Sequence, residues 1–130
     1  MIDHLSSYAT DYPATRAFYQ TALAPLGYTL QMEMAASDDR AGRRLCAFGP
    51  PGRPAFWIVE VAEPVTPRHV AFLAPDRPSV GAFHAAALRA GARDNGAPGL
   101  RPEYHEHYFG AFALDPDGNN VEAVCHSPEP

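Results

Sequence analysis

HLSSYATDYPATRAFYQTALA, residues 4–24, aligns without a gap on HVAFLAPDRPSVGAFHAAALR, residues 69–89. Eight of the 21 aligned positions are identical, at a constant offset of 65, which is half of the 130-residue chain. The identical pairs are His4/His69, Ala9/Ala74, Asp11/Asp76, Pro13/Pro78, Ala17/Ala82, Phe18/Phe83, Ala22/Ala87 and Leu23/Leu88. Alanine pairs match easily by chance, whereas a His, an Asp, a Pro and a Phe at one offset do not. Because two copies are too few for a solenoid, the sequence predicts one pseudo-symmetric domain over residues 1–130, with modules over about 1–64 and about 65–130.

Each half of the chain has the same order of local signals. A short strand comes first, and an Asp then caps a helix, Asp11 in the first half and Asp76 in the second. The Asp side chain accepts from the free N–H groups of the first helical turn, and a Pro two residues later has no N–H to satisfy. The predicted strands cover residues 2–9, 28–35, 44–48, 55–61, 68–75, 100–104, 108–114 and 120–125, with loops at 37–42 and 95–98. This β-α-β-β-β order, present twice, predicts an α+β fold.

The composition is that of an ordinary globular protein and excludes several classes of partner. The formal net charge is -5, so the chain repels the phosphate backbone of a nucleic acid. No apolar run approaches the roughly 18 residues that a membrane-spanning helix needs. The first residues, Met1-Ile2-Asp3, lack the basic start and apolar stretch of an export signal. We therefore expect a cytoplasmic protein with no membrane partner, whose cysteines, Cys46 and Cys125, are reduced thiols.

Three polar side chains fall on corresponding strand faces. His4 lies in the first predicted strand and His69 in the strand that repeats it, so the two occupy equivalent positions if the duplication folds symmetrically. In the last strand Glu122 lies on the face opposite Val121 and Ala123. An isolated His on a strand is usually structural, but a His present in both copies indicates a requirement for it. Two imidazoles and a carboxylate suit Fe, Ni, Zn, Mn or Co, so the sequence predicts one divalent metal ion bound by His4, His69 and Glu122.

These motifs, taken in order, resemble the vicinal oxygen chelate superfamily, which includes glyoxalase I, extradiol dioxygenases, fosfomycin-resistance enzymes and bleomycin-resistance proteins. The resemblance covers nearly the whole chain. Its motifs are His4, Asp11…Arg16-Ala17-Phe18-Tyr19, His69-Val70-Ala71-Phe72 and, most specifically, Asp115-Pro116-Asp117-Gly118-Asn119-Asn120-Val121-Glu122. It implies tandem βαβββ modules that form curved mixed sheets around a metal-binding cleft, with His4, His69 and Glu122 at ligand positions. It also implies a homodimer, and leaves open whether the site lies within one chain or is shared across the dimer.

The sequence departs from part of this family at the fourth ligand position. Glyoxalase I-type sites place a Glu or Gln there, but an offset of 65 from Glu122 leads to Trp57, and an alignment on the turn glycines leads to Phe56. Neither side chain binds a metal, which argues against glyoxalase I activity. Glu60 is the nearest carboxylate on this strand, so either Glu60 or water would fill the position. Three protein ligands leave the remaining positions to water, substrate or O2.

A dense group of titratable and aromatic residues, Tyr104-His105-Glu106-His107-Tyr108, precedes the strand beside Glu122. Extradiol enzymes of the family place a His and a Tyr near the metal, and the resemblance makes His105, Tyr104 and Tyr108 the candidate catalytic residues. An imidazole suits this role because it exchanges a proton near neutral pH. The alternative is a surface loop with ordinary aromatic residues, and this is our interpretation of His107.

Two functions of different kinds follow. The first is a glyoxalase- or dioxygenase-like metalloenzyme, a lyase, isomerase or dioxygenase, that acts on a small oxygen-bearing molecule by stabilising an enolate or oxyanion. The second is a metal-free ligand-binding protein of the bleomycin-resistance type, for which the acidic charge would suit a cationic drug. A third interpretation, a domain that kept the fold and lost the chemistry, is disfavoured by the metal-ligand set. Ligand binding that survives a chelator would distinguish the second function from the first.

Overall fold

The computed structural model describes residues 1–128, and its elements follow the order that the duplication predicts. The first module contains β1 (Leu5–Ala9), α1 (Tyr12–Ala22), β2 (Thr29–Met34), β3 (Leu45–Gly49) and β4 (Phe56–Glu60). The second contains β5 (His69–Leu73), α2 (Arg77–Arg89), β6 (Arg93–Leu100), β7 (Phe109–Leu114) and β8 (Asn120–Cys125). Short 3-10 turns at Ala24–Leu26 and Ala36–Asp38 flank β2. The α+β class and the two βαβββ modules are therefore confirmed.

The modules form two four-stranded mixed sheets with the same strand order. Sheet A has the order β1-β4-β3-β2, and sheet B has the order β5-β8-β7-β6. The β1–β4 and β5–β8 pairs are parallel, and the remaining pairs are antiparallel. The registers also agree, because Ser6 pairs with Trp57 in sheet A and Ala71 pairs with Glu122 in sheet B, at the offset of 65 that relates the two modules. Trp57 is therefore the structural counterpart of Glu122.

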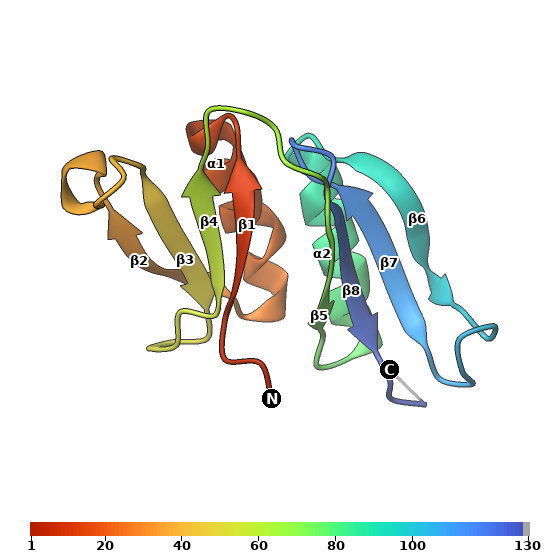
Figure 1. The fold of residues 1–130 in the computed structure, drawn as a ribbon. Helices are drawn as coiled ribbons and strands as arrows, with labels where there is room; N and C mark the ends of the chain where they lie inside the picture. Colours follow the sequence, from red (N-terminus) through yellow and green to blue (C-terminus); the bar gives the residue numbers. More distant parts are fainter. Residues whose placement is uncertain (129–130) are drawn as a thin grey trace.

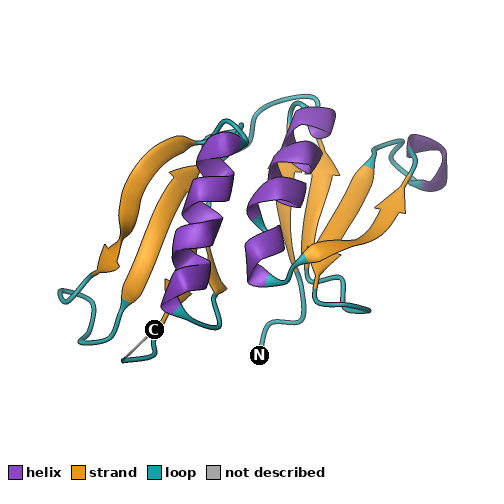
Figure 2. Ribbon diagram, turned by 180° about the vertical axis from the view of Figure 1, so that it is seen from behind, coloured by secondary structure: helices purple, strands orange, loops and turns teal. Residues whose placement is uncertain are grey.

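Both helices lie on one side of the two sheets (Figure 2), and the strands show their other side in the opposite view (Figure 1). The faces under the helices supply one buried apolar cluster with members from both modules, among them Phe18, Phe56, Phe72 and Phe83. Phe56 and Phe72 meet edge to face across the junction of the sheets, with ring centroids 5.1 Å apart. The opposite faces, called the open faces below, are covered by no helix of the described chain, and they carry the candidate site.

The helices begin at the predicted capping residues. Asp11 accepts a hydrogen bond from the backbone N–H of Ala14 at 3.2 Å, and Asp76 accepts one from Ser79 at 2.8 Å. Each helix has a Pro in its first turn. The chain leaves α2 through Gly91, whose φ of 99° is a backbone conformation that residues with a Cβ rarely adopt. Local sequence signals thus fix where each helix starts and where α2 stops.

Two strand boundaries differ from the sequence prediction. β1 begins at Leu5, so His4 lies just before the strand instead of within it. The predicted loop at 95–98 and strand at 100–104 are wrong, because β6 occupies Arg93–Leu100. Its register shifts between Asp94 and Gly96 and again between Gly96 and Gly99. A strand at the edge of a sheet has one side free of partners, so it tolerates bulges and a Pro that a central strand would not.

A buried carboxylate joins the two modules at the turn between β7 and β8. Asp115 is 5% exposed and accepts a hydrogen bond from the Tyr19 hydroxyl of α1 at 2.5 Å. It also accepts from the Asn119 side-chain amide at 2.9 Å and from the backbone N–H groups of Asp117 and Asn119. Burial and the neighbouring Asp115 raise the pKa of Tyr19 well above its usual value, so the hydroxyl stays a donor. Thr10 adds a second link by donating its hydroxyl to Asp117 at 2.6 Å.

Both cysteines are free thiols in the core, as the sequence predicts. Cys46 and Cys125 are buried on the helix-covered faces of different sheets. Burial raises the pKa of the Cys46 thiol, so it stays protonated and unreactive. Within residues 1–128, no helix combines the length and apolar character needed to cross a membrane.

We predict that Tyr19→Phe lowers the free energy of unfolding by about 1–3 kcal/mol, because the buried Asp115 carboxylate loses a donor from the other module. Urea denaturation at neutral pH measures this loss. Tyr8→Phe is the matched control, since the Tyr8 hydroxyl has no hydrogen-bond partner among residues 1–128 and Phe keeps the ring that Arg68 covers. Equal stabilities of the two variants would show that the Tyr19–Asp115 bond does not join the modules.

Candidate functional site

The open face of sheet B brings together two of the predicted ligands. β5 alternates strictly, with Val70 and Phe72 buried under the helices and His69 and Ala71 on the open side, as parity predicts. The parallel register places Ala71 beside Glu122 of β8, so Glu122 lies on the open face as well. Both strands lie near the centre of the molecule in Figure 1, beside sheet A.

Glu122 is the central group of this face. Its Oε1 atom lies 2.7 Å from Nε2 of His69, and its other oxygen accepts a hydrogen bond from the Tyr108 hydroxyl. Glu122 is 1% exposed, whereas 54% of the His69 side chain is exposed. Within residues 1–128, His69 is the only ion-pair partner of this carboxylate. A buried carboxylate is costly unless it is hydrogen-bonded or paired, and here an imidazole and a phenol supply the contacts.

The Tyr108 side chain fixes the second oxygen of Glu122. Burial and the Glu122 carboxylate raise the pKa of Tyr108, so the phenol stays protonated and acts as a donor at neutral pH. The ring of Tyr104 packs edge-on against that of Tyr108, with centroids 4.9 Å apart. Gly110 leaves room for this arrangement, because a Cβ there would stand 3.2 Å from the Tyr108 ring and 3.3 Å from the Glu122 carboxylate. Two residues of the predicted catalytic group thus support the Glu122 carboxylate.

His105, the third member of that group, has a partner that sequence reasoning did not predict. Its Nε2 atom lies 2.8 Å from Nδ1 of His126, beyond the end of β8. The backbone N–H of His107 donates to Nδ1 of His105, which places the His105 ring proton on Nε2, from where it is donated to His126. Both imidazole rings contact the Tyr108 ring, with centroids 5.3 and 5.4 Å away. His107 stays outside this cluster, 3.7 Å from Glu106, which agrees with its interpretation as a loop residue.

His4 lies apart from the other two predicted ligands. Its Nδ1 atom contacts the Asp3 carboxylate at 2.7 Å, and the side chain is 59% exposed. Within residues 1–128, no group of three or more His, Cys, Asp or Glu side chains is arranged to hold a metal ion. The structure therefore brings His69 and Glu122 together and leaves His4 just before β1, in the other module of the same chain.

The register shows which residue of module 1 corresponds to Glu122. Trp57 pairs with Ser6 as Glu122 pairs with Ala71, so Trp57 is the counterpart and lies on the open face of sheet A. Phe56 points to the opposite side and is 2% exposed within the core. An aromatic ring thus occupies the place in module 1 at which module 2 has its carboxylate.

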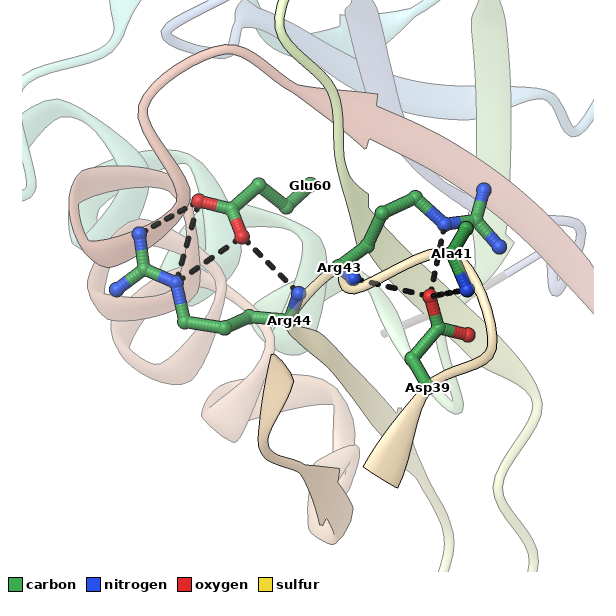
Figure 3. A network of polar contacts seen from close by, with 5 residues as sticks. All are labelled: Asp39, Ala41, Arg43, Arg44 and Glu60. Atoms are coloured by element: carbon green, nitrogen blue, oxygen red, sulfur yellow. Dashed lines mark hydrogen bonds and ion pairs between the residues drawn. The ribbon is translucent and has the colours of Figure 1, made fainter. Parts of the chain in front are cut away.

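Glu60, the other candidate for the fourth ligand position, is paired with an arginine. It is the last residue of β4, and its carboxylate binds the Arg44 guanidinium at 2.6 Å and the Arg44 backbone N–H at 3.0 Å (Figure 3). These hydrogen bonds from Arg44 lower the pKa of Glu60 to about 2. In the neighbouring loop the Asp39 carboxylate forms a similar ion pair with the Arg43 guanidinium (Figure 3). Glu60 neutralises Arg44 at the end of sheet A where Ala9 lies, which is far along β1 from His4.

His126 and Asp115 are the residues whose roles sequence reasoning missed. His126 comes directly after the last strand, where spacing alone shows no partner. A signal for Asp115 was present, because a turn Asp followed by an Asn four residues later can close on itself through side-chain hydrogen bonds. Its contact with Tyr19 joins residues 96 positions apart, which no local pattern indicates.

The fold consists of two βαβββ modules with the same strand order and register. One module carries a His–Glu pair on its open sheet face. The protein is therefore of the class built from two such modules. The sequence profile described as the Glyoxalase/Bleomycin resistance protein/Dioxygenase superfamily matches residues 1–123. The chain belongs to this superfamily. None of the curated proteins matches it significantly.

Several solved structures share the fold at low sequence identity. A glyoxalase/bleomycin resistance protein from Albidiferax ferrireducens is 22% identical with a TM-score of 0.71, over 96% of this chain and 98% of that one. A glyoxalase I variant from Zea mays is 20% identical with a TM-score of 0.71, over 95% of this chain but 46% of that one. TnmS3, an antibiotic-binding protein from a Streptomyces species, is 21% identical with a TM-score of 0.67, over 98% and 96% of the two chains. At these identities the likeness establishes the fold.

We predict that Glu60→Gln lowers the free energy of unfolding at pH 7 and leaves any bound metal unchanged. Because folding lowers the pKa of Glu60 from 4.5 to about 2, its stabilising effect is complete above pH 4.5 and disappears as the pH falls towards 2. Urea denaturation across this range should show the wild type and the variant converging at low pH. Glu63→Gln, at an exposed carboxylate after β4, is the control and should show no such trend. A loss of bound metal in Glu60→Gln would contradict the assignment.

Proposed function

We propose that His69 and Glu122 of one chain, with His4 of a second copy, bind one divalent metal ion. The whole chain then works as one domain of a metalloenzyme that acts on a small oxygen-bearing molecule. The 2.7 Å contact between His69 and the buried Glu122 carries this proposal. Metal–ligand bonds of about 2.0–2.2 Å place neighbouring donors roughly 3–3.5 Å apart, so a small separation of this hydrogen-bonded pair would let both atoms bind one ion. Imidazole and carboxylate donors suit Fe, Ni, Zn, Mn or Co.

The surroundings of His4 fit the role of third ligand. A ligating His commonly donates its other ring N–H to a carboxylate, which holds the ring in place. The Nδ1 atom of His4 faces Asp3 at 2.7 Å, which leaves Nε2 free to bind an ion. Since the His4 side chain is 59% exposed, a second chain can reach it.

A twofold dimer would complete the site. If sheet A of one copy faces sheet B of the other, His4 of each chain meets His69 and Glu122 of its partner, and two equivalent sites result. The strands also present large apolar side chains to solvent in the single chain. Met32 is 45%, Leu100 is 49% and Leu73 is 68% exposed. Contact with a second copy would remove some of this apolar surface from water.

The metal ion and the side chains around the proposed site have different roles in the reaction. A bound divalent ion supplies a Lewis acid that polarises an oxygen of the bound molecule. Tyr108, with its raised pKa, keeps its proton and holds Glu122 in place, and Tyr104 fixes the Tyr108 ring. Proton transfer is then left to an imidazole, and His105 is suited to it because its ring lies beside Tyr108 and its proton is shared with His126.

We predict that tag-free wild-type protein holds about one divalent ion per chain by elemental analysis. His69→Ala, Glu122→Gln and His4→Ala should each retain less than about a tenth of that content, because each removes a ligand. His107→Ala is the matched control and should keep the full content, since this imidazole lies outside the cluster. Size-exclusion chromatography with light scattering on the same samples reports whether a dimer forms.

Mixing two depleted variants tests whether the site is shared. A dimer of one His4→Ala chain and one His69→Ala chain has one complete site and one doubly broken site. Random exchange of subunits should therefore restore about a quarter of the wild-type metal content. Full depletion of the mixture, although its chains exchange, would contradict a shared site. Wild-type protein that stays metal-free after reconstitution would contradict the metalloenzyme itself.

We also predict that Tyr108→Phe weakens metal affinity by about tenfold, because Glu122 loses the hydrogen bond that holds its second oxygen. Competition with a chromogenic chelator measures the change. Tyr104→Phe is the control, since it keeps the ring that packs on Tyr108 and removes only a hydroxyl. Unchanged affinity in Tyr108→Phe would show that the phenol does not support the ligand.

A metal-free ligand-binding protein is the second candidate function. Trp57 favours it, because an aromatic ring replaces a carboxylate at the counterpart of Glu122. TnmS3, whose fold is similar, is described as an antibiotic-binding protein. This function requires ligand binding to persist after chelation and in His69→Ala.

A further inference from the structure

Arg101 places a guanidinium beside the His69–Glu122 pair, on the open face of sheet B. It comes directly after β6, and its Cζ atom lies 5.4 Å from the centroid of the Phe112 ring. Phe112 pairs in register with Glu122, and its ring centroid lies 6.2 Å from that of His69. One aromatic ring therefore separates the guanidinium from the two proposed metal ligands.

Two backbone carbonyl groups fix the Arg101 guanidinium without neutralising it. Its Nη1 atom donates to the carbonyl of Gly99 at 2.9 Å, and its Nη2 atom donates to that of Ala97 at 2.8 Å. A guanidinium has five N–H donors, so three remain available. Within residues 1–128, no carboxylate forms an ion pair with Arg101, and Glu106 of the following loop lies instead 3.7 Å from His107. The half-buried side chain is thus a fixed cation whose charge is not compensated.

The irregular shape of β6 makes room for this guanidinium. Gly96 lies opposite Phe112, and a Cβ there would stand 2.8 Å from the Phe112 ring and 3.2 Å from Nη2 of Arg101. A Cβ at Gly99 would stand 3.2 Å from Nη1. Both register shifts of β6 occur at these glycines. Bulges re-aim a side chain and are common beside functional sites, so the shape of the edge strand fits a role for Arg101 on this face.

The carboxylates of the neighbouring strands are bonded to other groups. Asp94 of β6 lies 3.0 Å from Nε2 of His84 on α2, and Glu122 of β8 is held by the imidazole and the phenol described above. An anion from solution therefore meets no competing carboxylate at Arg101, and a bound divalent ion would offset the charge of Glu122. The net charge of -5 is spread over the whole chain, and salt screens its distant members beyond about 8 Å.

We infer that Arg101 binds a carboxylate group at the far end of the molecule whose oxygens the proposed metal site holds. A planar guanidinium matches the geometry of a carboxylate and can donate two parallel hydrogen bonds to it. The Phe112 ring lies between the two polar ends, so the molecule extends by about the length of one ring from the ion to Arg101. The inference rests on the proposed function in assigning the near end to the ion. Recognition of a carboxylate by Arg101 needs no metal, so the two proposals can fail separately.

The test uses zinc-loaded protein and three benzohydroxamates that differ only in the para group, which is a carboxylate, a carboxamide or an aminomethyl cation. The hydroxamate supplies two adjacent oxygens to the ion, and the para group lies one ring away. Isothermal titration calorimetry should show the carboxylate probe binding at least about tenfold more tightly than the other two. The same preference, at weaker absolute affinity, is expected by ligand-observed NMR in EDTA and in His69→Ala.

Variants of Arg101 distinguish recognition of the carboxylate from a general effect of charge. In Arg101→Gln the preference for the carboxylate probe should fall below about twofold, whereas Arg101→Lys, which keeps the charge without the planar fork, should retain at least about threefold. Arg89→Gln removes the same charge from the exposed last turn of α2, so it is the matched control and should keep the full preference. Zinc content and oligomeric state should equal those of the wild type in all three variants, and thermal unfolding verifies that each is folded.

Three results would overturn the inference. The first is equal affinity of the wild type for the carboxylate and carboxamide probes, and the second is a preference that survives in Arg101→Gln. The third is loss of zinc, or of a dimer that the wild type forms, in Arg101→Gln, as expected if the guanidinium pairs with a carboxylate of a second copy. A wild type that binds no zinc but keeps the preference for the carboxylate probe would remove the proposed metal site and leave the carboxylate site in place.

Discussion

The hydrogen bond between the Tyr19 hydroxyl and the buried Asp115 carboxylate is the interaction on which the arrangement of the two modules depends. The carboxylate closes the turn before β8 through Asn119 and the backbone, and it accepts the Tyr19 hydroxyl from α1 of the other module. A carboxylate buried to this degree is stable only when donors surround it, so the turn and the first helix need each other. The same turn sets the start of β8, and therefore which face of that strand carries Glu122.

The duplication explains both the symmetry of the fold and the asymmetry of the site. Strand order and register are the same in both sheets, because backbone pairing depends little on which side chains the strands carry. The open faces have diverged. Sheet B combines His69, Glu122 and Tyr108 into a polar cluster, while the equivalent surface of sheet A is apolar around Trp57. Two copies of one module thus offer two different surfaces, one polar and the other mainly apolar.

Glu122 and Glu60 show how different the environments of two strand carboxylates can be. The Glu122 carboxylate is buried without an Arg partner among the described residues, and its contacts come from an imidazole and a phenol. Glu60, on the corresponding sheet of module 1, has the opposite environment, since Arg44 neutralises it by several hydrogen bonds. The two carboxylates therefore differ in whether a fixed guanidinium neutralises them, and residue type alone does not reveal this difference.

The sequence by itself determined the repeat, the order of the elements, the Asp caps and the strand parity that puts His69 and Glu122 on open positions. These features depend on residues a few positions apart or on one constant offset, so spacing is enough to find them. The tertiary structure alone decided that Trp57 and not Phe56 is the counterpart of Glu122, and that residues 95–98 lie within the irregular edge strand β6. It also decided that Glu60 binds Arg44, that His105 meets His126 and that His4 stands apart from His69 within one chain. Each of these outcomes depends on register or on packing between distant segments, where local patterns carry no information.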